Sequence, residues 1–240
     1  RTSSNNGSSY GSWSSYYTSA QNITLSSQGQ WKIQCEVEDN AGNKATLTSG
    51  TYNIDKTNPS GSFSPSSQSW TNSNVTVKFT PSDSGGSGVN QWRYRTSSNN
   101  GSSYGSWSSY YTSAQNISLS SQGQWKIQVQ VSDKAGNSAT LTSGTYQIDK
   151  TAPSGSLSAS TTSWTNGNVT ITASGSDSGG SGFYRIKKPD GTYATGTSTT
   201  YTVSSNGTYS FVFYDNAGNS TTKSITISNI DKTKPSASFA

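Results

Sequence analysis

Six aspartates are the side chains of this chain whose type and spacing could hold a metal ion. They fall into two matched sets of three: Asp55, Asp83 and Asp133, and Asp149, Asp177 and Asp215. In each set one aspartate lies in a linker, one in a loop rich in Ser and Gly, and one in a hairpin turn. Calcium takes roughly six to eight oxygen ligands from carboxylates, carbonyls and water, so each set predicts a calcium site. The alternative is ordinary aspartate turn chemistry, with the linker charge neutralised by Lys56 or Lys150.

Four aromatic residues in a polar insertion form a second candidate site. The insertion spans residues 96–114, and its rings are Tyr104, Trp107, Tyr110 and Tyr111, set among Ser, Gly and Asn. Rigid amphipathic rings beside small hydrogen-bonding residues suit recognition, and aromatic faces are natural platforms for sugars. The same rings would also serve to cap their own module or to pack against the next one. Both interpretations stay open at the level of sequence.

The remaining composition argues against several classes of function. The chain has no histidine, which removes the Ser-His-Asp and Cys-His arrangements and the commonest zinc ligand. Its 16 Lys and Arg are spread singly, with Lys187-Lys188 the only adjacent pair, whereas nucleic-acid binding needs a patch or stripe. No stretch approaches the ~20 apolar residues that span a bilayer. We therefore expect no enzyme, no nucleic-acid partner and no membrane insertion in this segment.

The elements that must position these residues are repeated along the chain. Residues 1–55 reappear as residues 95–149 with seven substitutions, and a looser copy follows. The phrase Ile-Asp-Lys-Thr-x-Pro closes each copy and is called the seam below; it occurs at Ile54–Pro59, Ile148–Pro153 and Ile230–Pro235. Repetition of this kind predicts an array. We expect the C-terminal part of a module at 1–55, complete modules at 56–149 and, shorter, at 150–231, and the first strand of a further module at 232–240. In the shorter module a plain hairpin around Pro189-Asp190-Gly191 is expected in place of the polar insertion.

Within residues 56–149 the apolar residues alternate as strands require. The stretch Asn74–Thr80 places its apolar residues on one face, and Trp125–Val131 has the strongest alternation. Trp70 is expected to close one end of the core, and Gly144 to mark a bulge in the last strand. About seven short strands per ~80–95 residues, with turns every ~8–12 residues, indicate an Ig-like β-sandwich. The predicted fold class is therefore all-β, with tandem Ig-like β-sandwich modules in an elongated array.

The predicted sandwich has consequences for the candidate residues. The linker, the loop after the second strand and the last hairpin lie at the same end of such a sandwich, so each aspartate set should gather at a module junction. The single cysteine, Cys35, falls on the apolar phase of its strand and is expected to be buried, as Val129 is in the second copy. Residues 1–55 hold only half of a sandwich and are expected to expose strand edges and apolar faces.

A turn of sequence Asp-x-Ala-Gly-Asn precedes every seam, at residues 39–43, 133–137 and 215–219. This pairing of turn and seam resembles the bacterial Ig-like repeats of large surface proteins and adhesins, and the resemblance covers essentially the whole chain. It implies an extracellular location on the bacterial cell surface, in a stalk or adhesin region. A fold of this kind hosts many functions, so the resemblance does not identify a ligand.

We predict a structural stalk or spacer segment whose partners are the neighbouring repeats of the same protein. One alternative is an adhesin or carbohydrate-binding array that uses the aromatic insertion to bind surface glycans or receptors on host or partner cells. A second is a filament subunit that completes its partial modules by strand exchange. Calcium is the one cofactor that the sequence suggests.

Overall fold

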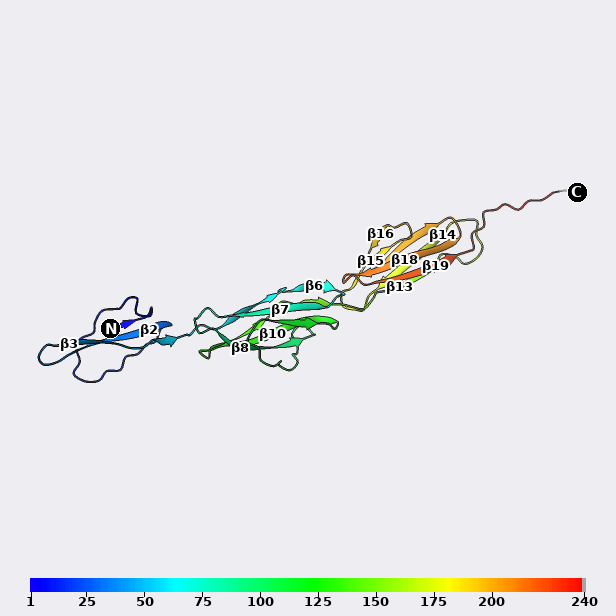
Figure 1. The fold of residues 1–240 in the computed structure, drawn as a ribbon. Helices are drawn as coiled ribbons and strands as arrows, with labels where there is room; N and C mark the ends of the chain where they lie inside the picture. Colours follow the sequence, from blue (N-terminus) through cyan, green and yellow to red (C-terminus); the bar gives the residue numbers. More distant parts are fainter. Residues whose placement is uncertain (239–240) are drawn as a thin grey trace.

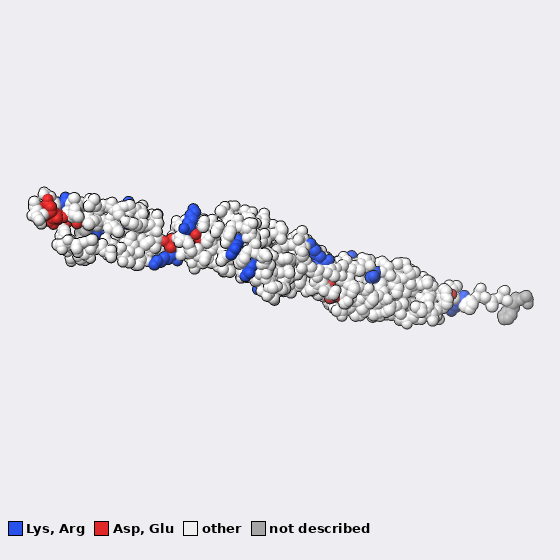
Figure 2. All heavy atoms as spheres, turned by 90° about the horizontal axis from the view of Figure 1, so that it is seen from below, with Lys and Arg blue, Asp and Glu red and all other residues white. Residues whose placement is uncertain are grey.

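The computed structural model describes residues 1–238, which form strands and no helix, in three groups arranged in a row (Figure 1). The first strand group comprises β1–β4, the second β5–β12 and the third β13–β19. The first and third strand groups lie at opposite ends of an elongated molecule, along which Lys and Arg are scattered on the face drawn in Figure 2. The described chain contains no helix with the length and apolar character needed to cross a membrane.

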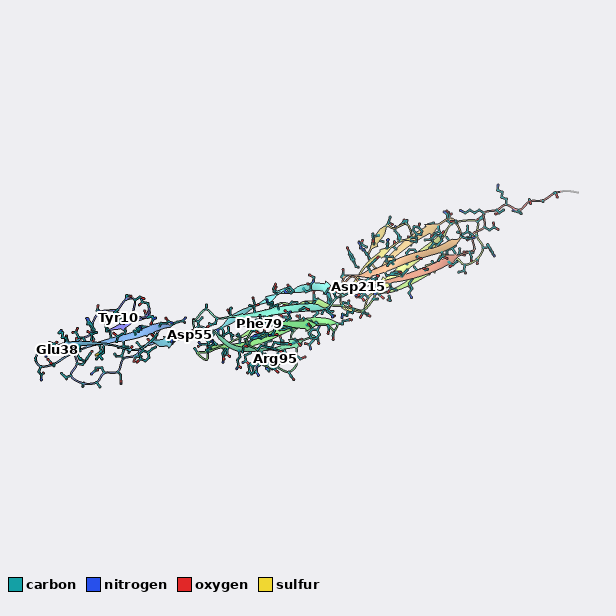
Figure 3. The ribbon with its side chains drawn as sticks, viewed as in Figure 1. Tyr10, Glu38, Asp55, Phe79, Arg95 and Asp215 are labelled. Carbon is teal, nitrogen blue, oxygen red and sulfur yellow. The ribbon has the colours of Figure 1, made fainter. Side chains whose placement is uncertain are left out.

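The second strand group is a sandwich of two sheets. Its strands are β5 (Ser60–Ser64), β6 (Gln68–Thr71), β7 (Val75–Ser82), β8 (Val89–Ser97), β9 (Gln115–Leu119), β10 (Gly123–Asp133), β11 (Ser138–Thr142) and β12 (Tyr146–Ile148). One sheet has the order β5-β7-β9; the other has the order β11-β10-β12-β6, with β8 also paired to β10. Val77 and Phe79 of β7 meet Ile127 and Val129 of β10 in a core where all four are 0% exposed; Phe79 is labelled in Figure 3. The alternation predicted for both strands is confirmed: buried and exposed residues alternate from Val75 in β7, and buried and half-buried residues alternate from Ile127 in β10.

Two local expectations for this group need correction or refinement. Trp70 does not close the core: it is half-buried at the end of β6 and lies outside the core cluster. The phase change predicted as a bulge at Gly144 is instead an interruption of the strand, which divides it into β11 and β12, and both of these pair with β10. A Cβ atom on Gly144 would lie 2.7 Å from the backbone oxygen of Ser66, so only glycine permits this close approach.

The third strand group is a second sandwich with its own core. Its strands are β13 (Ser154–Ala159), β14 (Val169–Ser176), β15 (Phe183–Lys187), β16 (Tyr193–Thr195), β17 (Ser198–Val203), β18 (Gly207–Asp215) and β19 (Ser220–Ile227). The sheet β13-β14-β17 faces the sheet β16-β15-β18-β19, and Ile171, Ile186 and Phe213 are fully buried between them. A plain β15–β16 hairpin replaces the aromatic insertion, as the Pro-Asp-Gly sequence predicts. Residues 232–238 form no strand, since the described chain offers them no partner, and residues 239–240 of the expected strand lie outside the described range.

The first strand group is a single sheet. Its strands are β1 (Thr2–Ser3), β2 (Gly29–Glu38), β3 (Lys44–Thr48) and β4 (Tyr52–Ile54), with β1, β3 and β4 all paired to β2. The predicted exposure of apolar residues is confirmed, since Val37 is 47% exposed and Leu47 is 60% exposed. The prediction that Cys35 is buried is wrong: it is exposed, because no second sheet covers β2.

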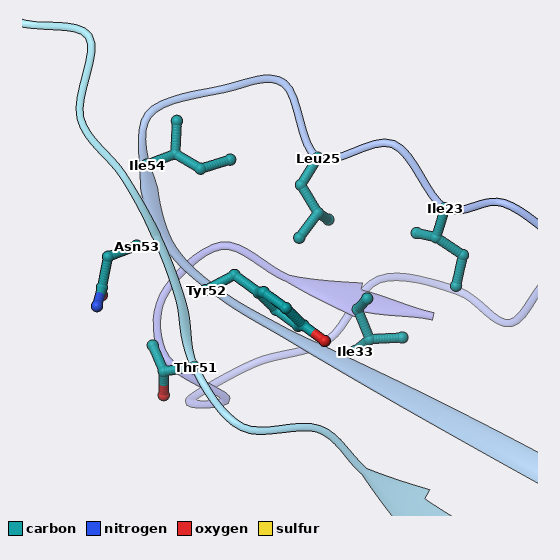
Figure 4. Close-up of a pocket in the computed structure, with 7 residues that line it drawn as sticks. All are labelled: Ile23, Leu25, Ile33, Thr51, Tyr52, Asn53 and Ile54. Atoms are coloured by element: carbon teal, nitrogen blue, oxygen red, sulfur yellow. The ribbon is translucent and has the colours of Figure 1, made fainter. Parts of the chain in front are cut away.

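An open apolar groove runs along this uncovered sheet (Figure 4). Its volume is about 680 Å³, and its lining residues are Ile23, Leu25, Ile33, Thr51, Tyr52, Asn53 and Ile54. The copies of Ile23 and Leu25 in the second group are Ile117 and Leu119 of β9, which are buried. Residues 21–25 form no strand, because β9 pairs with β7 and β7 has no counterpart in the first group. The groove is therefore the inner face of a half-sandwich.

Candidate functional site

The structure brings each predicted aspartate set together between two strand groups. In each set the carboxylate oxygens lie within 4.8 Å of one another. Asp55 comes from the seam after β4, Asp83 from the loop after β7 and Asp133 from the end of β10. The second set repeats this arrangement at the next seam, and Figure 3 labels Asp55 and Asp215 at the two places. Asp133, Asp149 and Asp215 are at most 1% exposed, so both clusters are partly enclosed.

Amide groups hold the carboxylates of the first cluster in place. The Asp55 carboxylate accepts from the backbone N–H of Thr57 at 2.9 Å and from that of Ser87 at 3.0 Å. Hydrogen bonds from Ser87 and Thr57 hold the pKa of Asp55 below its usual value. The Asp133 carboxylate accepts from the backbone N–H of Asn137 at 2.8 Å and from its side-chain amide at 2.7 Å. That amide also donates to the backbone oxygen of Asp55 at 3.1 Å, which ties the hairpin to the seam.

The second cluster has the same set of hydrogen bonds. Asp149 accepts from the amides of Thr151 and Ser181, both at 2.9 Å. Asn219 repeats the role of Asn137: its side-chain amide donates to Asp215 at 2.7 Å and to the backbone oxygen of Asp149 at 2.9 Å. The Asn of the Asp-x-Ala-Gly-Asn turn therefore joins the hairpin to the preceding seam at both places.

The donor set of each cluster fits a hard cation. All the ligand atoms are oxygens, which calcium prefers. Among residues 1–238, the ion pairs join Lys44 to Glu36 and Glu38, and none reaches these aspartates. Lys150, expected as a neutralising neighbour, instead donates to the side chain of Asn74 and the backbone of Ser120 at 2.6 Å. Backbone N–H groups and the side-chain amides of Asn137 and Asn219 also satisfy these carboxylates without a metal, so calcium binding stays a prediction.

The aromatic insertion lies against the outer face of its own strand group. The guanidinium of Arg93 lies 4.8 Å from the ring centre of Trp107 and 5.0 Å from that of Tyr110. The guanidinium of Arg95 lies 4.5 Å from Trp107 and 5.0 Å from Tyr104. Three of the four predicted aromatic residues thus form a ladder of alternating rings and cations, each contact contributing about 0.5–2 kcal/mol.

The fourth ring and the cations belong to the sandwich itself. Tyr111 packs beside Trp92, with ring centres 5.2 Å apart, and so contributes to the core. Gln130 accepts from Arg93 at 2.8 and 3.0 Å, and Gln128 accepts from Arg95 at 2.9 Å, across the β8–β10 register.

The two arginines that pack against the rings of the insertion were not included in its sequence interpretation. The sequence feature that could have identified them is an Arg-x-Arg pair on the outward-facing phase of β8. The insertion has a packing role, while Tyr110 keeps 51% of its surface exposed.

Comparisons with known proteins agree with this architecture. The family whose model matches is described as a bacterial Ig-like domain, over residues 3–56 and 59–150, which is more than half of the chain. No curated protein matches the chain.

Three solved structures match the chain at low similarity. The fibronectin(III)-like modules of Clostridium thermocellum CbhA are 15% identical, with 75% of this chain and 100% of that chain covered and a TM-score of 0.37. The chicken CNTN1 FN1–FN3 domains are 12% identical, with coverages of 82% and 75% and a TM-score of 0.34. A tetra-tandem repeat in the extending region of a large adhesion protein is 15% identical, with coverages of 85% and 57% and a TM-score of 0.28.

The repeated sandwiches, the Asp-x-Ala-Gly-Asn turn before each seam and the family match over two segments lead to one conclusion. This chain belongs to the bacterial Ig-like domain family.

Proposed function

We propose that this chain is a stalk or spacer segment of a bacterial cell-surface or secreted repeat protein. Its modules would be 56–149 and 150–231, with part of a module at 1–55 and the start of another at 232–240. Domains of this family are typically structural and extracellular, and we propose no catalytic role. The neighbouring repeats of the same protein are the partners that a spacer requires.

One seam residue carries the proposal, because it is bonded to the strand groups on both of its sides. The backbone N–H of Asp149 donates to the backbone oxygen of Thr71 in the second group at 2.9 Å. Its carboxylate accepts from Ser181 of the third group at 2.9 Å, and its backbone oxygen accepts from Asn219 at 2.9 Å. Asp149 is 0% exposed, so water does not compete for these bonds. A seam held in this way supports a stiff connection.

Small-angle X-ray scattering with a mass measurement in solution tests the proposal. We expect an elongated monomer whose maximum dimension matches a straight row of strand groups. Asp149→Ala should increase the spread of conformations. Asp231→Ala is the matched control, since among residues 1–238 the Asp231 carboxylate accepts only from Thr233 of its own seam. A compact particle, or an equal spread in the unaltered chain and Asp149→Ala, would contradict a stiff spacer. A concentration-dependent dimer would favour the filament alternative, in which another chain completes the groove of the first group.

The adhesin or carbohydrate-binding alternative rests on Tyr110. This ring ends the aromatic ladder, with 51% of its surface exposed beside the Arg93 guanidinium. Tyr110→Ala should abolish retention on immobilised glycans while leaving the unfolding midpoint nearly unchanged if the ring binds sugar. Tyr104→Ala, at the other end of the ladder, is the control and should leave glycan retention unchanged if Tyr110 is the ring that binds. No retention of the unaltered chain would exclude glycan binding under the conditions used.

Calcium at the junction clusters is the finer prediction within the spacer proposal. Bound calcium would join three carboxylates from a seam, a loop and a hairpin, and would stiffen the junction. Calorimetric titration of the chain with calcium should give heat and a raised melting temperature, and Asp83→Asn with Asp177→Asn should remove both. No heat and no thermal shift at millimolar metal would remove calcium from the proposal and leave the spacer itself untouched.

A further inference from the structure

The end of the second strand group that meets the third has a contact outside the aspartate cluster. Gln122 lies in the turn before β10, and its side-chain amide donates to the backbone oxygen of Gly179 at 2.5 Å. Its side-chain oxygen accepts from the Thr151 hydroxyl in the seam at 2.7 Å. One glutamine therefore bonds both the seam and the loop of the following group.

A tryptophan lies against the next residue of the same loop. A Cβ atom on Gly180 would lie 3.2 Å from Cη2 of Trp70, so the indole ring is in contact with this glycine. Gly180 also has a φ of +107°, which residues with a side chain rarely adopt. Trp70, which is not part of the core of its own group, is thus placed where the following group begins.

The other junction has the same glutamine contact. Gln28 donates to the backbone oxygen of Gly85 at 3.1 Å and accepts from the Thr57 hydroxyl at 2.5 Å. The position that corresponds to Trp70 lies before residue 1, and among the described residues a Cβ atom on Gly86 would have nothing within 4 Å. A cleft of about 470 Å³ there is lined in part by Gln28, Gly85 and Gly86. The glutamine contact thus recurs at both junctions.

The far end of the third group carries the tryptophan without the glutamine. Its tryptophan is Trp164, which is 74% exposed. The position of the glutamine is taken by Asn206, a shorter side chain that bonds the backbone of Ile230 in its own group, donating and accepting at 2.9 Å. The end of the second group therefore pairs its tryptophan with glutamine, and the end of the third group pairs its tryptophan with asparagine.

We propose that Trp70 and Gln122 form a recognition surface for one partner, the Gly-Gly step of the Asp-Ser-Gly-Gly-Ser-Gly loop of a following repeat. The surface determines how tightly two consecutive repeats are held, and this inference rests on the proposed spacer function. The loop occurs at residues 83–88 and 177–182, and its glycines offer a free carbonyl to the glutamine and a bare backbone to the tryptophan. Trp164 presents the tryptophan half of this surface to any further loop of the same sequence.

The test measures the distance distribution across the second junction with two spin labels. Cysteines at exposed Thr140 and Ser224 carry the labels, in a chain where Cys35→Val removes the natural thiol. We expect one narrow distribution in the parent chain, and a distribution about twofold wider or more after Gln122→Ala or Trp70→Ala. Gln28→Ala is the matched control, since it removes the same contact at the other junction and should leave this distribution unchanged.

A change on the partner side tests the contact without altering the tryptophan. Gly180→Ala and Gly182→Ala both place a side chain at positive φ in the same loop, at +107° and +79°, but only the first places it against Trp70. We expect Gly180→Ala to widen the distribution and Gly182→Ala to leave it narrow.

The possible outcomes separate this inference from the spacer proposal. A narrow distribution in the parent, Gln122→Ala and Trp70→Ala chains alike would overturn the recognition surface while leaving a stiff spacer in place. A broad distribution in the parent chain would overturn the stiff spacer itself. Equal widening in Gly180→Ala and Gly182→Ala would assign the effect to backbone strain in the loop and overturn the tryptophan contact.

Discussion

Strands β2–β4 and β10–β12 have nearly the same sequence, but only β10–β12 pack against a second sheet. Tyr52 is 49% exposed, whereas its copy Tyr146 is 0% exposed and donates from its hydroxyl to the backbone oxygen of Pro65 at 2.8 Å. Burial raises the pKa of Tyr146 to about 12. Val37 is 47% exposed and its copy Val131 is 0% exposed. The strands thus form in both groups, but their apolar side chains contribute to stability by burial only where an opposite sheet covers them.

The seven substitutions between the copies include charged residues on the exposed first group that are uncharged in the second. The substitutions pair Thr24 with Ser118, Cys35 with Val129, Glu36 with Gln130, Glu38 with Ser132, Asn40 with Lys134, Lys44 with Ser138 and Asn53 with Gln147. Three of these positions form an ion cluster on the first group, in which Lys44 lies 3.1 Å from Glu36 and 3.5 Å from Glu38. Tyr16 donates to Glu36 at 2.7 Å, whereas its copy Tyr110 stacks on Arg93.

The reactivity of matched thiols should give the largest contrast. Cys35 is exposed, while Val129 at the same place in the second copy is 0% exposed. A thiol placed there by Val129→Cys, with Cys35→Val, should react with a thiol reagent on the order of a thousandfold more slowly than Cys35, because the core must open first. Equal reaction rates for the two thiols under folding conditions would mean that the core of the second group is as accessible to the reagent as the uncovered sheet of the first group.

Truncation of a matched isoleucine should give the next largest effect. Ile127 is 0% exposed, and Ile127→Ala should destabilise the second group by about 2–5 kcal/mol through lost burial and a cavity. Ile33→Ala at the half-buried copy should cost about 1 kcal/mol or less. Hydrogen exchange followed by mass spectrometry resolves the two groups in one sample. Similar losses from both changes would indicate that another surface covers β2 in solution.

The aromatic ladder should contribute less than the core. Trp107 lies between two guanidinium groups, at 4.8 Å from Arg93 and 4.5 Å from Arg95. Within residues 1–238 its copy Trp13 lies beside one guanidinium group, that of Arg1, at 4.3 Å, and the position corresponding to Arg93 lies before residue 1. Trp107→Ala should therefore cost about 1–2 kcal/mol in the second group, and Trp13→Ala less in the first. Denaturant unfolding with exchange detection measures both. If Trp107→Ala left the free energy of unfolding of the second group unchanged, the packing role would be wrong and ligand binding would be the better explanation of the insertion.

Acid should have the smallest effect, and mainly on the first group. Hydrogen bonds from Tyr16 and then Lys44 hold the pKa of Glu36 below the usual value of 4.5. A carboxylate with a lowered folded pKa contributes stability that is present above that usual value and is lost as pH falls through the folded pKa. Lowering the pH from about 5 to about 3 should therefore speed exchange in β2 and β3. Glu36→Gln, which installs the residue of the second copy, should remove this part of the acid response; an unchanged response would assign it to other carboxylates.

Short-range pattern explains which parts of the molecule could be predicted. The alternation around Val75–Phe79 predicted β7, and the Pro-Asp-Gly sequence predicted the β15–β16 hairpin. The aspartates could be placed at one end of each sandwich, because a seam, a loop and a hairpin meet there in this topology. The partners of Gln122 and Trp70 could not be predicted, since they lie 57 residues away at Gly179 and across a junction at Gly180.

Sequence by itself determined which residues face each side of a strand, because side chains alternate along an extended backbone. It also determined the repeat, the seams and the matched aspartates. Only the tertiary structure decided which of those faces is covered: Cys35 and Val129 occupy the same phase of the same strand, yet one is exposed and the other buried. The physical reason is that burial is a property of two surfaces in contact, and a strand encodes only one of them.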